Sequence, residues 1–444
     1  MRRRITSHWR ASVIGLLLAA GLANLTHAQE ATPVDPALEQ RLTEIARETA
    51  ALRGLDPLDN IDDLVLTRPE LQQRLPDILT RDLDPAELEA ATRALIAIGL
   101  LPEGSDLQQL TLELLGDQVA GFYDPLTDEM YVIRDGAFSA EAYYYAHEVV
   151  HALQDAYLDP DDLMEVVESD NDDESLAMAA LYEGDAVAVS NDYLAAHPDL
   201  AFDLMREAGS AVGASGLDRA PAPMVATLVF PYTAGLPFVT LLREDGGWDA
   251  VNAAYADMPA STEQVLHPEK YAQRDQPVTL ALPTPAEALG SGWREVHQNT
   301  LGELQVALLL ADLPPGRGFN TLTGSIELPA PARNAAAGWD GDRYALWADT
   351  AGQETLVWRT AWDTEQDARA FAAALTRFEE ARWGGVFNGE SANDIALVTN
   401  DVAARILLRG QEVFYVQSPT LALADQAQAA LLAAPAPAPL PGPG

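Results

Sequence analysis

The spacing of apolar residues predicts mainly helices from residue 36 to residue 312. Apolar positions recur every three or four residues over 36–52 and 85–98, which is the period of a helix with one buried face. Glycine and proline interrupt the pattern between these two segments. We interpret residues 29–116, which contain both segments, as a helical N-terminal part that serves as a cap or a pro-segment.

The hydrophobic pattern predicts strands in two regions. Residues 119–123 and 130–133 are short apolar runs on either side of a turn sequence at 124–128, so we expect a hairpin there. Residues 342–433 combine several strand patterns with a helical period over 365–378. This combination predicts a small C-terminal α+β domain.

Two stretches of biased composition flank that C-terminal domain. Residues 318–341 are rich in Pro, Ala, Gly and Asn, and we interpret them as a linker. Residues 434–444 contain mostly Pro, Ala and Gly, so we expect a disordered tail. The predicted fold class is therefore α+β, with a mainly helical domain that holds a small sheet over residues 117–317, followed by the smaller α+β domain.

The amino terminus is typical of a secretory signal peptide, residues 1–28. A basic start precedes an apolar run from Ala11 to Leu25, and small residues precede Gln29. The run is shorter than the roughly 20 residues that a helix needs to cross a bilayer. We predict cleavage after Ala28, although an uncleaved anchor has a similar pattern. We expect no later segment to be long and apolar enough to cross a membrane, so the mature chain would have no membrane span and would be secreted, periplasmic or in the cell envelope.

Composition excludes several kinds of site and partner. The chain has 0 cysteines, which excludes disulfides, thiol catalysis and cysteine metal ligands. The formal net charge of −41 argues against nucleic acid or an anionic membrane as a partner, because like charges repel. An acidic loop is expected over residues 159–174, and Ca²⁺ could bind near Asp170 to Glu174. That loop lacks EF-hand spacing, so solvation is the preferred interpretation.

The sequence HEVVH at residues 147–151 matches the HExxH pattern of metallopeptidases. It lies in a helix that we expect to run from Ser139, as N-cap, to about Tyr157. Residues four apart share one face of a helix, so His147 and His151 can bind one ion, while Glu148 lies beside them and can reach an activated water. We expect one Zn²⁺ per chain, because zinc accepts imidazole and carboxylate ligands.

A third ligand is expected from a helix over residues 175–196. Glu183 lies on its apolar face, where a carboxylate is costly unless it is paired with an arginine or bound to metal. Asp185 lies about 200° around the helix from Glu183, so it is either solvated or supports the ligands from behind. Asp155, one turn beyond His151, could accept a hydrogen bond from a ligand imidazole and fix its tautomer, or simply end the helix.

The stretch HEVVHALQDAY, followed by a helix that carries EGDA, resembles the gluzincin, or thermolysin-like, zinc metallopeptidases. Together with AGFYDP and STEQVLHP, it also resembles a bacterial group of predicted secreted metallopeptidases. The resemblance covers about residues 117–190. It implies a zincin-like domain in which His147, His151 and Glu183 hold zinc and Glu148 is the general base.

The resemblance implies an exported zinc metallopeptidase whose partner is a peptide or protein substrate. A strand at 122–124 or 130–133 could pair with the substrate backbone. His267, Tyr232 and Tyr271 are candidate donors to the oxyanion, with ordinary packing as the alternative for each.

Two other functions stay open. The chain could be a zinc-retaining binding or assembly protein without turnover, although the intact Glu148 argues against this function. It could also be a zinc amidase that acts on the cell wall. The sequence predicts neither the substrate nor the oligomeric state.

Overall fold

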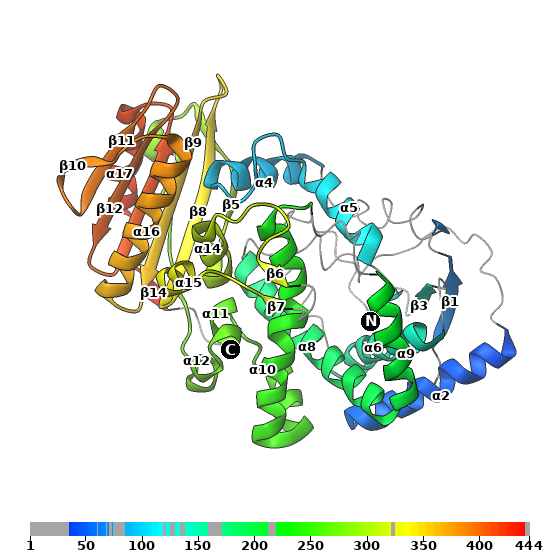
Figure 1. Ribbon diagram of the computed structural model, residues 1–444. Coiled ribbons are helices and arrows are strands. Elements are labelled where there is room, and N and C mark those ends of the chain that lie inside the picture. The colour runs from blue at the N-terminus through cyan, green and yellow to red at the C-terminus, as the bar shows by residue number, and fades with distance from the viewer. Residues whose placement is uncertain are drawn as a thin grey trace.

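The computed structural model describes residues 35–439, apart from 60, 68, 71–72, 74–84, 119–120, 125–128, 134–137, 159–170, 212–218 and 321–324. The predicted signal peptide therefore lies outside the described residues. Helices make up 56% of the structure and strands 20%, with a seven-stranded sheet near the C-terminus (Figure 1). The prediction of an α+β fold with a small C-terminal domain is confirmed.

The N-terminal part is built from long helices. They are α2 (Pro36–Arg53), α4 (Pro85–Ile98), α5 (Leu107–Gln118), α6 (Phe138–Tyr157), α8 (Asp172–Ala196), α9 (Pro198–Ala211) and α10 (Ala222–Tyr255). Helix α2 ends at Gly54, whose φ of 76° lies in the left-handed region that favours glycine. Leu42, Ile45 and Ala50 of α2 are buried in one cluster with residues of α6. Helix α2 therefore forms part of the core.

A three-stranded sheet lies beside α6. Its strands are β1 (Asp62–Leu66), β2 (Gly121–Asp124) and β3 (Glu129–Ile133), in the order β1-β3-β2. Strand β2 pairs antiparallel with β3, so the predicted hairpin is confirmed, although its turn lies outside the described residues. Strand β1 pairs parallel with β3 and comes from the N-terminal part, for which we had predicted helices. Strand β3 is therefore central and β2 is at an edge.

The starts of two helices differ from the predictions. Helix α6 ends at Tyr157 as predicted but begins at Phe138, so Ser139 lies in its first turn and is not its N-cap. Helix α8 begins before Ser175, because Asn171 is its N-cap and accepts a hydrogen bond from the Glu174 amide. Residues 171–174, predicted as loop, thus form the cap and first turn of α8, where carboxylates are favoured by the helix dipole.

Helices α8 and α10 cross at two glycines. A Cβ on Gly184 would overlap the backbone of Gly235, and a Cβ on Gly235 would overlap the carbonyl oxygen of Ala180. The backbones of the two helices are therefore in contact, with no room for a side chain between them. Helix α10 is kinked at Gly246 and Gly247, whose backbone angles are not helical, so this crossing positions the part of α10 that precedes Gly246.

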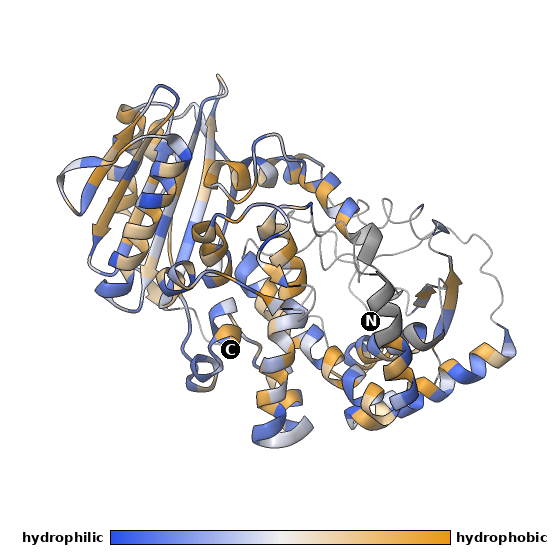
Figure 2. Ribbon diagram, viewed as in Figure 1, coloured by the Kyte–Doolittle hydropathy of each residue, from blue (hydrophilic) through white to orange (hydrophobic). Residues whose placement is uncertain are grey.

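Helix α10 is long and apolar enough, by length and composition alone, to cross a membrane. The prediction that no segment after the signal peptide would meet this test is therefore wrong. In the structure 44% of its most apolar window is buried, and α10 packs along α8 (Figure 2). Phe230, Phe238 and Tyr255 are the largest buried side chains of this helix.

The C-terminal domain is an antiparallel sheet in the order β10-β11-β12-β13-β9-β8-β5. Its strands are β5 (Trp293–Asn299), β8 (Trp339–Asp349), β9 (Glu354–Trp362), β10 (Asn388–Ser391), β11 (Asp394–Val398), β12 (Ala403–Arg409) and β13 (Glu412–Ser418). Helices α16 (Glu365–Trp383) and α17 (Leu421–Ala433) cover opposite faces. Trp358 packs in the cluster that includes α16, whereas the adjacent Val357 packs in the cluster that includes α17, and neighbours in a strand point to opposite faces.

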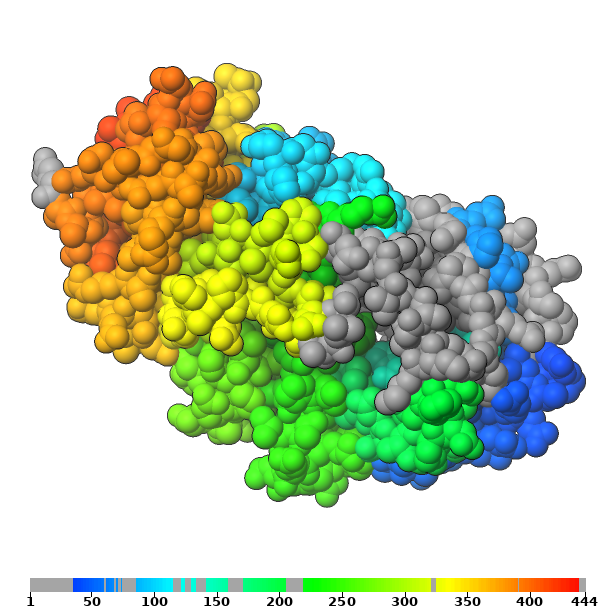
Figure 3. All heavy atoms as spheres, in the orientation of Figure 1, coloured from blue at the N-terminus to red at the C-terminus, as the bar shows by residue number. Residues whose placement is uncertain are grey.

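The C-terminal domain begins earlier in the structure than the sequence predicted. The proposed linker, 318–341, contains β6 (Phe319–Asn320), β7 (Ser325–Ile326), α15 (Ala330–Ala336) and the first residues of β8. The sheet also begins upstream, at β5. One buried cluster runs from Leu95 of α4 through Phe230 of α10 to Phe371 of α16, and Figure 3 shows α4 lying against the sheet domain. Packing is therefore continuous where a linker was predicted.

Short elements complete the described fold: α11 (Thr262–Leu266), α12 (Pro268–Gln273), β4 (Val278–Thr279), α13 (Pro285–Leu289), α14 (Gly302–Ala311) and β14 (Ala438–Pro439). Strand β14 pairs with β4, so the predicted tail, 434–444, is ordered at residues 438–439. Residues 440–444 lie outside the described residues.

Candidate metal centre

Two histidines of α6 and a glutamate of α8 meet at one point. Nε2 of His147 lies 3.1 Å from Oε2 of Glu183 and 3.2 Å from Nε2 of His151. Nε2 of His151 lies 3.4 Å from the same Glu183 oxygen. Within the described residues, this is the one group of three or more His, Asp or Glu that could hold a metal ion. The three predicted ligands are therefore assembled.

Close packing of α6 on α8 explains why the three side chains converge. Val150 lies between the two histidines in sequence and is buried with Ala186 and Val189 of α8. The side chains of His147, His151 and Glu183 remain 12%, 20% and 14% exposed. The cluster thus lies where two helices touch, yet solvent can reach it.

The histidines and the glutamate of the cluster stabilise each other's charged forms. Burial lowers the pKa of His151, but the charge and hydrogen bond of Glu183 outweigh this effect and raise it to about 9. Burial raises the pKa of Glu183, but the two histidines outweigh burial and hold it well below its usual range. Glu183 is therefore a carboxylate at any pH at which the protein is expected to work.

We expect metal affinity to rise with pH up to about 9. Below that pH a proton occupies His151, and a metal ion must displace it, so affinity should fall by about tenfold per pH unit. Competition with a chromophoric chelator between pH 6 and 10 measures this dependence. His197→Gln is the matched control, because His197 pairs with Glu48 and is not in the cluster. Affinity that stays constant from pH 6 to 9 would contradict the prediction.

Glu148 points from α6 towards the edge strand β2. The amide N–H of Tyr123 donates to Oε2 of Glu148 at 3.0 Å. Glu148 is not one of the three described residues that could hold a metal ion. Of the two strands proposed to pair with a substrate, β3 lies between two other strands, whereas β2 has a neighbouring strand on one side only among the described residues. Strand β2 is therefore the better candidate.

Tyr232 of α10 is the predicted oxyanion donor that lies at the cluster. Its ring stacks on that of His147, with centroids 6.1 Å apart. Burial of its hydroxyl end, the charges of Glu183 and Glu148 and a hydrogen bond to Glu183 raise the pKa of Tyr232, so it stays protonated. The residue as a whole is 40% exposed, which leaves its ring accessible from solvent.

The other two oxyanion candidates have different partners. Nε2 of His267 lies 3.0 Å from Oε1 of Glu303, and this hydrogen bond raises the pKa of His267. The hydroxyl of Tyr271 donates to the carbonyl of Asp257. No described contact joins either side chain to the metal cluster. Of the three candidates, the geometry therefore favours Tyr232 over His267 and Tyr271 as the donor.

The residues behind the ligands also differ from the prediction. Nδ1 of His151 lies 2.8 Å from Oε1 of Gln154, whereas Asp155 accepts a hydrogen bond from the Tyr123 hydroxyl. Asp185 is fully buried and paired with Arg53, which excludes the solvated alternative. Sequence reasoning missed Gln154, although it lies three residues after His151 on the same helix face. It also missed Arg53, for which the sequence carries no local signal.

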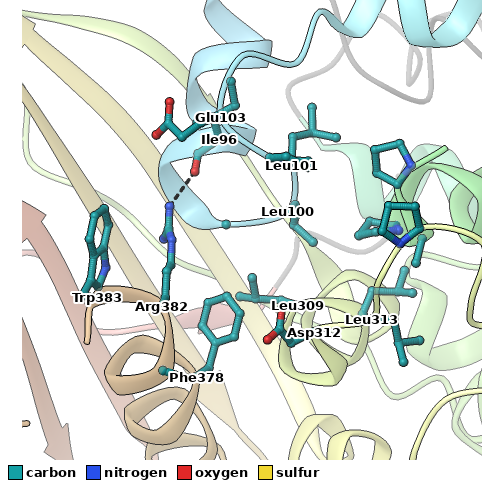
Figure 4. Close-up of a pocket in the computed structure, with 18 residues that line it drawn as sticks. Ile96, Leu100, Leu101, Glu103, Leu309, Asp312, Leu313, Phe378, Arg382 and Trp383 are labelled. Atoms are coloured by element: carbon teal, nitrogen blue, oxygen red, sulfur yellow. Dashed lines mark hydrogen bonds between the residues drawn. The ribbon is translucent and has the colours of Figure 1, made fainter. Parts of the chain in front are cut away.

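A separate cavity of about 400 Å³ lies between α4, α14 and α16 (Figure 4). Leu100, Leu309 and Phe378 contribute apolar walls, and Nη2 of Arg382 donates to the Ile96 carbonyl at its edge. None of the metal-cluster residues lines it.

One comparison with known proteins found a match. A family model described as a domain of unknown function (DUF8575) matches residues 288–428. No curated protein and no solved structure matches the chain. The matched range begins in α13 and ends in α17, so it contains the whole seven-stranded sheet, including β5. It contains none of the metal-cluster residues, so the function of the cluster rests on its own geometry.

Proposed function

We propose that the protein is a zinc-dependent metallopeptidase, with His147, His151 and Glu183 as zinc ligands. Nitrogen and oxygen ligands of tetrahedral zinc lie about 2.0–2.1 Å from the ion, so they are about 3.3–3.4 Å from each other. The observed separations of 3.1, 3.2 and 3.4 Å fit one face of such a tetrahedron. Two imidazoles and one carboxylate, with the fourth position open, are the donor set of a catalytic zinc site.

Glu148 is the proposed general base. Zinc, when bound, supplies a Lewis acid that polarises the scissile carbonyl and makes water a stronger nucleophile near neutral pH. The Glu148 carboxylate takes a proton from the attacking water and returns it to the nitrogen of the leaving amine. Because the Tyr123 amide holds Oε2, we assign Oε1 as the atom that receives the proton.

The position of strand β2 favours a peptide as the substrate. The Tyr123 amide of β2 donates to Glu148, and β2 is an edge strand among the described residues, so an extended backbone that pairs with the remaining edge groups of β2 would place a peptide bond next to the general base. Backbone pairing requires successive N–H and C=O groups, which peptides have and small amides lack. The signal-peptide pattern at residues 1–28 favours a substrate outside the cytoplasm.

We expect Tyr232→Phe to lower kcat by about 10²–10³-fold with little change in KM, because its hydroxyl donates to the oxyanion only as that charge develops. Steady-state kinetics on a cleaved peptide measures this split. Tyr271→Phe is the control, because the Tyr271 hydroxyl donates to the Asp257 carbonyl. Equal losses in the two variants would remove Tyr232 from the mechanism.

Metal analysis combined with a peptide library tests the proposal. Purified mature protein should contain about one zinc per chain and cleave peptides, and a chelator should abolish cleavage until zinc is restored. Absence of stoichiometric metal would overturn the zinc site. Stoichiometric zinc without cleavage of any peptide would instead favour the binding or assembly function.

A further inference from the structure

A line of buried hydrogen-bonding groups connects the metal cluster to helix α2. Oε1 of Gln154 lies 2.8 Å from Nδ1 of His151, and Nε2 of Gln154 lies 3.3 Å from Oδ2 of Asp185. Nε of Arg53 donates to Oδ2 of Asp185 at 3.0 Å. Arg53 and Asp185 are 0% exposed and Gln154 is 1% exposed. Water cannot reach these three side chains, so each can form hydrogen bonds only with its protein neighbours.

The chemistry of these groups determines the direction of each hydrogen bond. A guanidinium only donates, and a carboxylate or a carbonyl only accepts. The Gln154 atom that faces Asp185 also lies 3.0 Å from the carbonyl oxygen of Tyr182, so it must be the amide nitrogen. The amide oxygen then faces His151. Because that oxygen only accepts, Nδ1 of His151 carries a proton, and in the neutral ring Nε2 has the lone pair that a metal needs.

Helix α2 holds the far end of the line. Nη2 of Arg53 donates to Oδ1 of Asn252 at 2.8 Å, and its guanidinium stacks on Trp248 with 4.4 Å to the ring centroid. Nε1 of Trp248 donates to the carbonyl of Leu52 at 2.9 Å, which ties α2 to α10. The Tyr255 hydroxyl donates a further hydrogen bond to Asp185 at 2.7 Å. These contacts give the Arg53 side chain a defined orientation.

From this geometry we infer that Arg53, Asp185 and Gln154 are positioning residues for His151, and that helix α2 is an integral part of the metal centre. This inference rests on the proposed metal site. It also means that residues 29–116, which contain helix α2, cannot be cleaved off as a pro-segment without exposing Asp185. Arg53, Asp185 and Gln154 act on the metal only through His151.

Metal affinity of the full-length mature chain tests the inference. Gln154→Leu should weaken Zn²⁺ and Co²⁺ binding by about 10–100-fold, as measured by competition with a chelator. Arg53→Met should also weaken binding, and Arg53→Lys should restore part of it, because lysine keeps the charge beside Asp185. Asp155→Asn and Arg47→Met are the controls, since Asp155 bonds Tyr123 and Arg47 is exposed on α2. Wild-type affinity in folded Gln154→Leu and Arg53→Met would overturn the inference.

Proton NMR of the Co²⁺-loaded protein supplies a signal that would not change if Gln154 had only a structural role. The Nδ1–H of His151 should give a shifted, slowly exchanging resonance, and Gln154→Leu should make its exchange fast. The wild-type spectrum decides the point even where a variant does not fold, because absence of a slowly exchanging resonance overturns the inference. Metal binding without peptidase activity contradicts the proposed hydrolase alone. A wild-type chain that binds neither ion overturns both.

Discussion

Replacing Glu148 by glutamine is expected to lower kcat for peptide hydrolysis by about 10²–10⁴-fold, while about one metal ion per chain stays bound. Glutamine has the shape of glutamate but cannot take a proton from water. Its amide oxygen can still accept the hydrogen bond that the Tyr123 amide donates to Oε2 of Glu148. The three ligands do not include Glu148, so metal content should not change.

The Glu148→Gln experiment needs kinetics and metal analysis on the same preparation. His147→Ala should lose both metal and activity, which separates the role of a ligand from that of a base. Glu89→Gln, an exposed carboxylate on α4, should behave as wild type. If Glu148→Gln kept more than about a tenth of the wild-type kcat, another group would have to be the general base.

Replacing Gly235 by alanine is expected to lower the free energy of unfolding by about 1–3 kcal/mol, because the new Cβ would overlap the carbonyl oxygen of Ala180. Helices α8 and α10 would have to separate. Tyr232 lies one turn before Gly235 on α10, so its hydroxyl should move away from Glu183 and peptidase activity should fall as well. Denaturant unfolding and kinetics measure the two effects.

Gly292→Ala is the matched control for Gly235→Ala. An added Cβ at Gly292 meets nothing within 4 Å, so its effect on stability should stay within about 0.5 kcal/mol. Equal stabilities of the Gly235 and Gly292 variants would contradict the close crossing of α8 and α10. Loss of stability without loss of activity would instead show that Tyr232 keeps its place when the helices move.

Local patterns predicted most of the elements that carry the candidate site. The HEVVH helix, the hairpin before it and the end of α8 at Ala196 lie where periodicity and turn residues indicated. The inward carboxylate was also predictable, because Glu183 shares the apolar face of its helix. Each of these features depends on residues close together in the sequence, and local propensities determine them.

Errors arose where contacts between distant segments decide the outcome. Composition marked residues 318–341 as a linker, but packing against α14 and α16 orders α15 there. Proline-rich surroundings suggested His267, Tyr232 and Tyr271 equally as donors, and of these the packing of α10 brings Tyr232 to the cluster. The apolar composition of α10 is that of a membrane span, yet this helix packs along α8 in the described fold.

By itself the sequence predicted the three residues of the cluster, His147, His151 and Glu183, and the candidate base, because HExxH spacing and an apolar helix face are properties of single helices. Only the tertiary structure decided which groups support them. The amide oxygen of Gln154 faces His151 because its amide nitrogen donates to Asp185 and to the Tyr182 carbonyl. Asp185 can be buried because it pairs with Arg53, which lies 132 residues away in the sequence. A buried charge needs a partner whose place depends on the whole fold, and no local pattern reports where that partner will be.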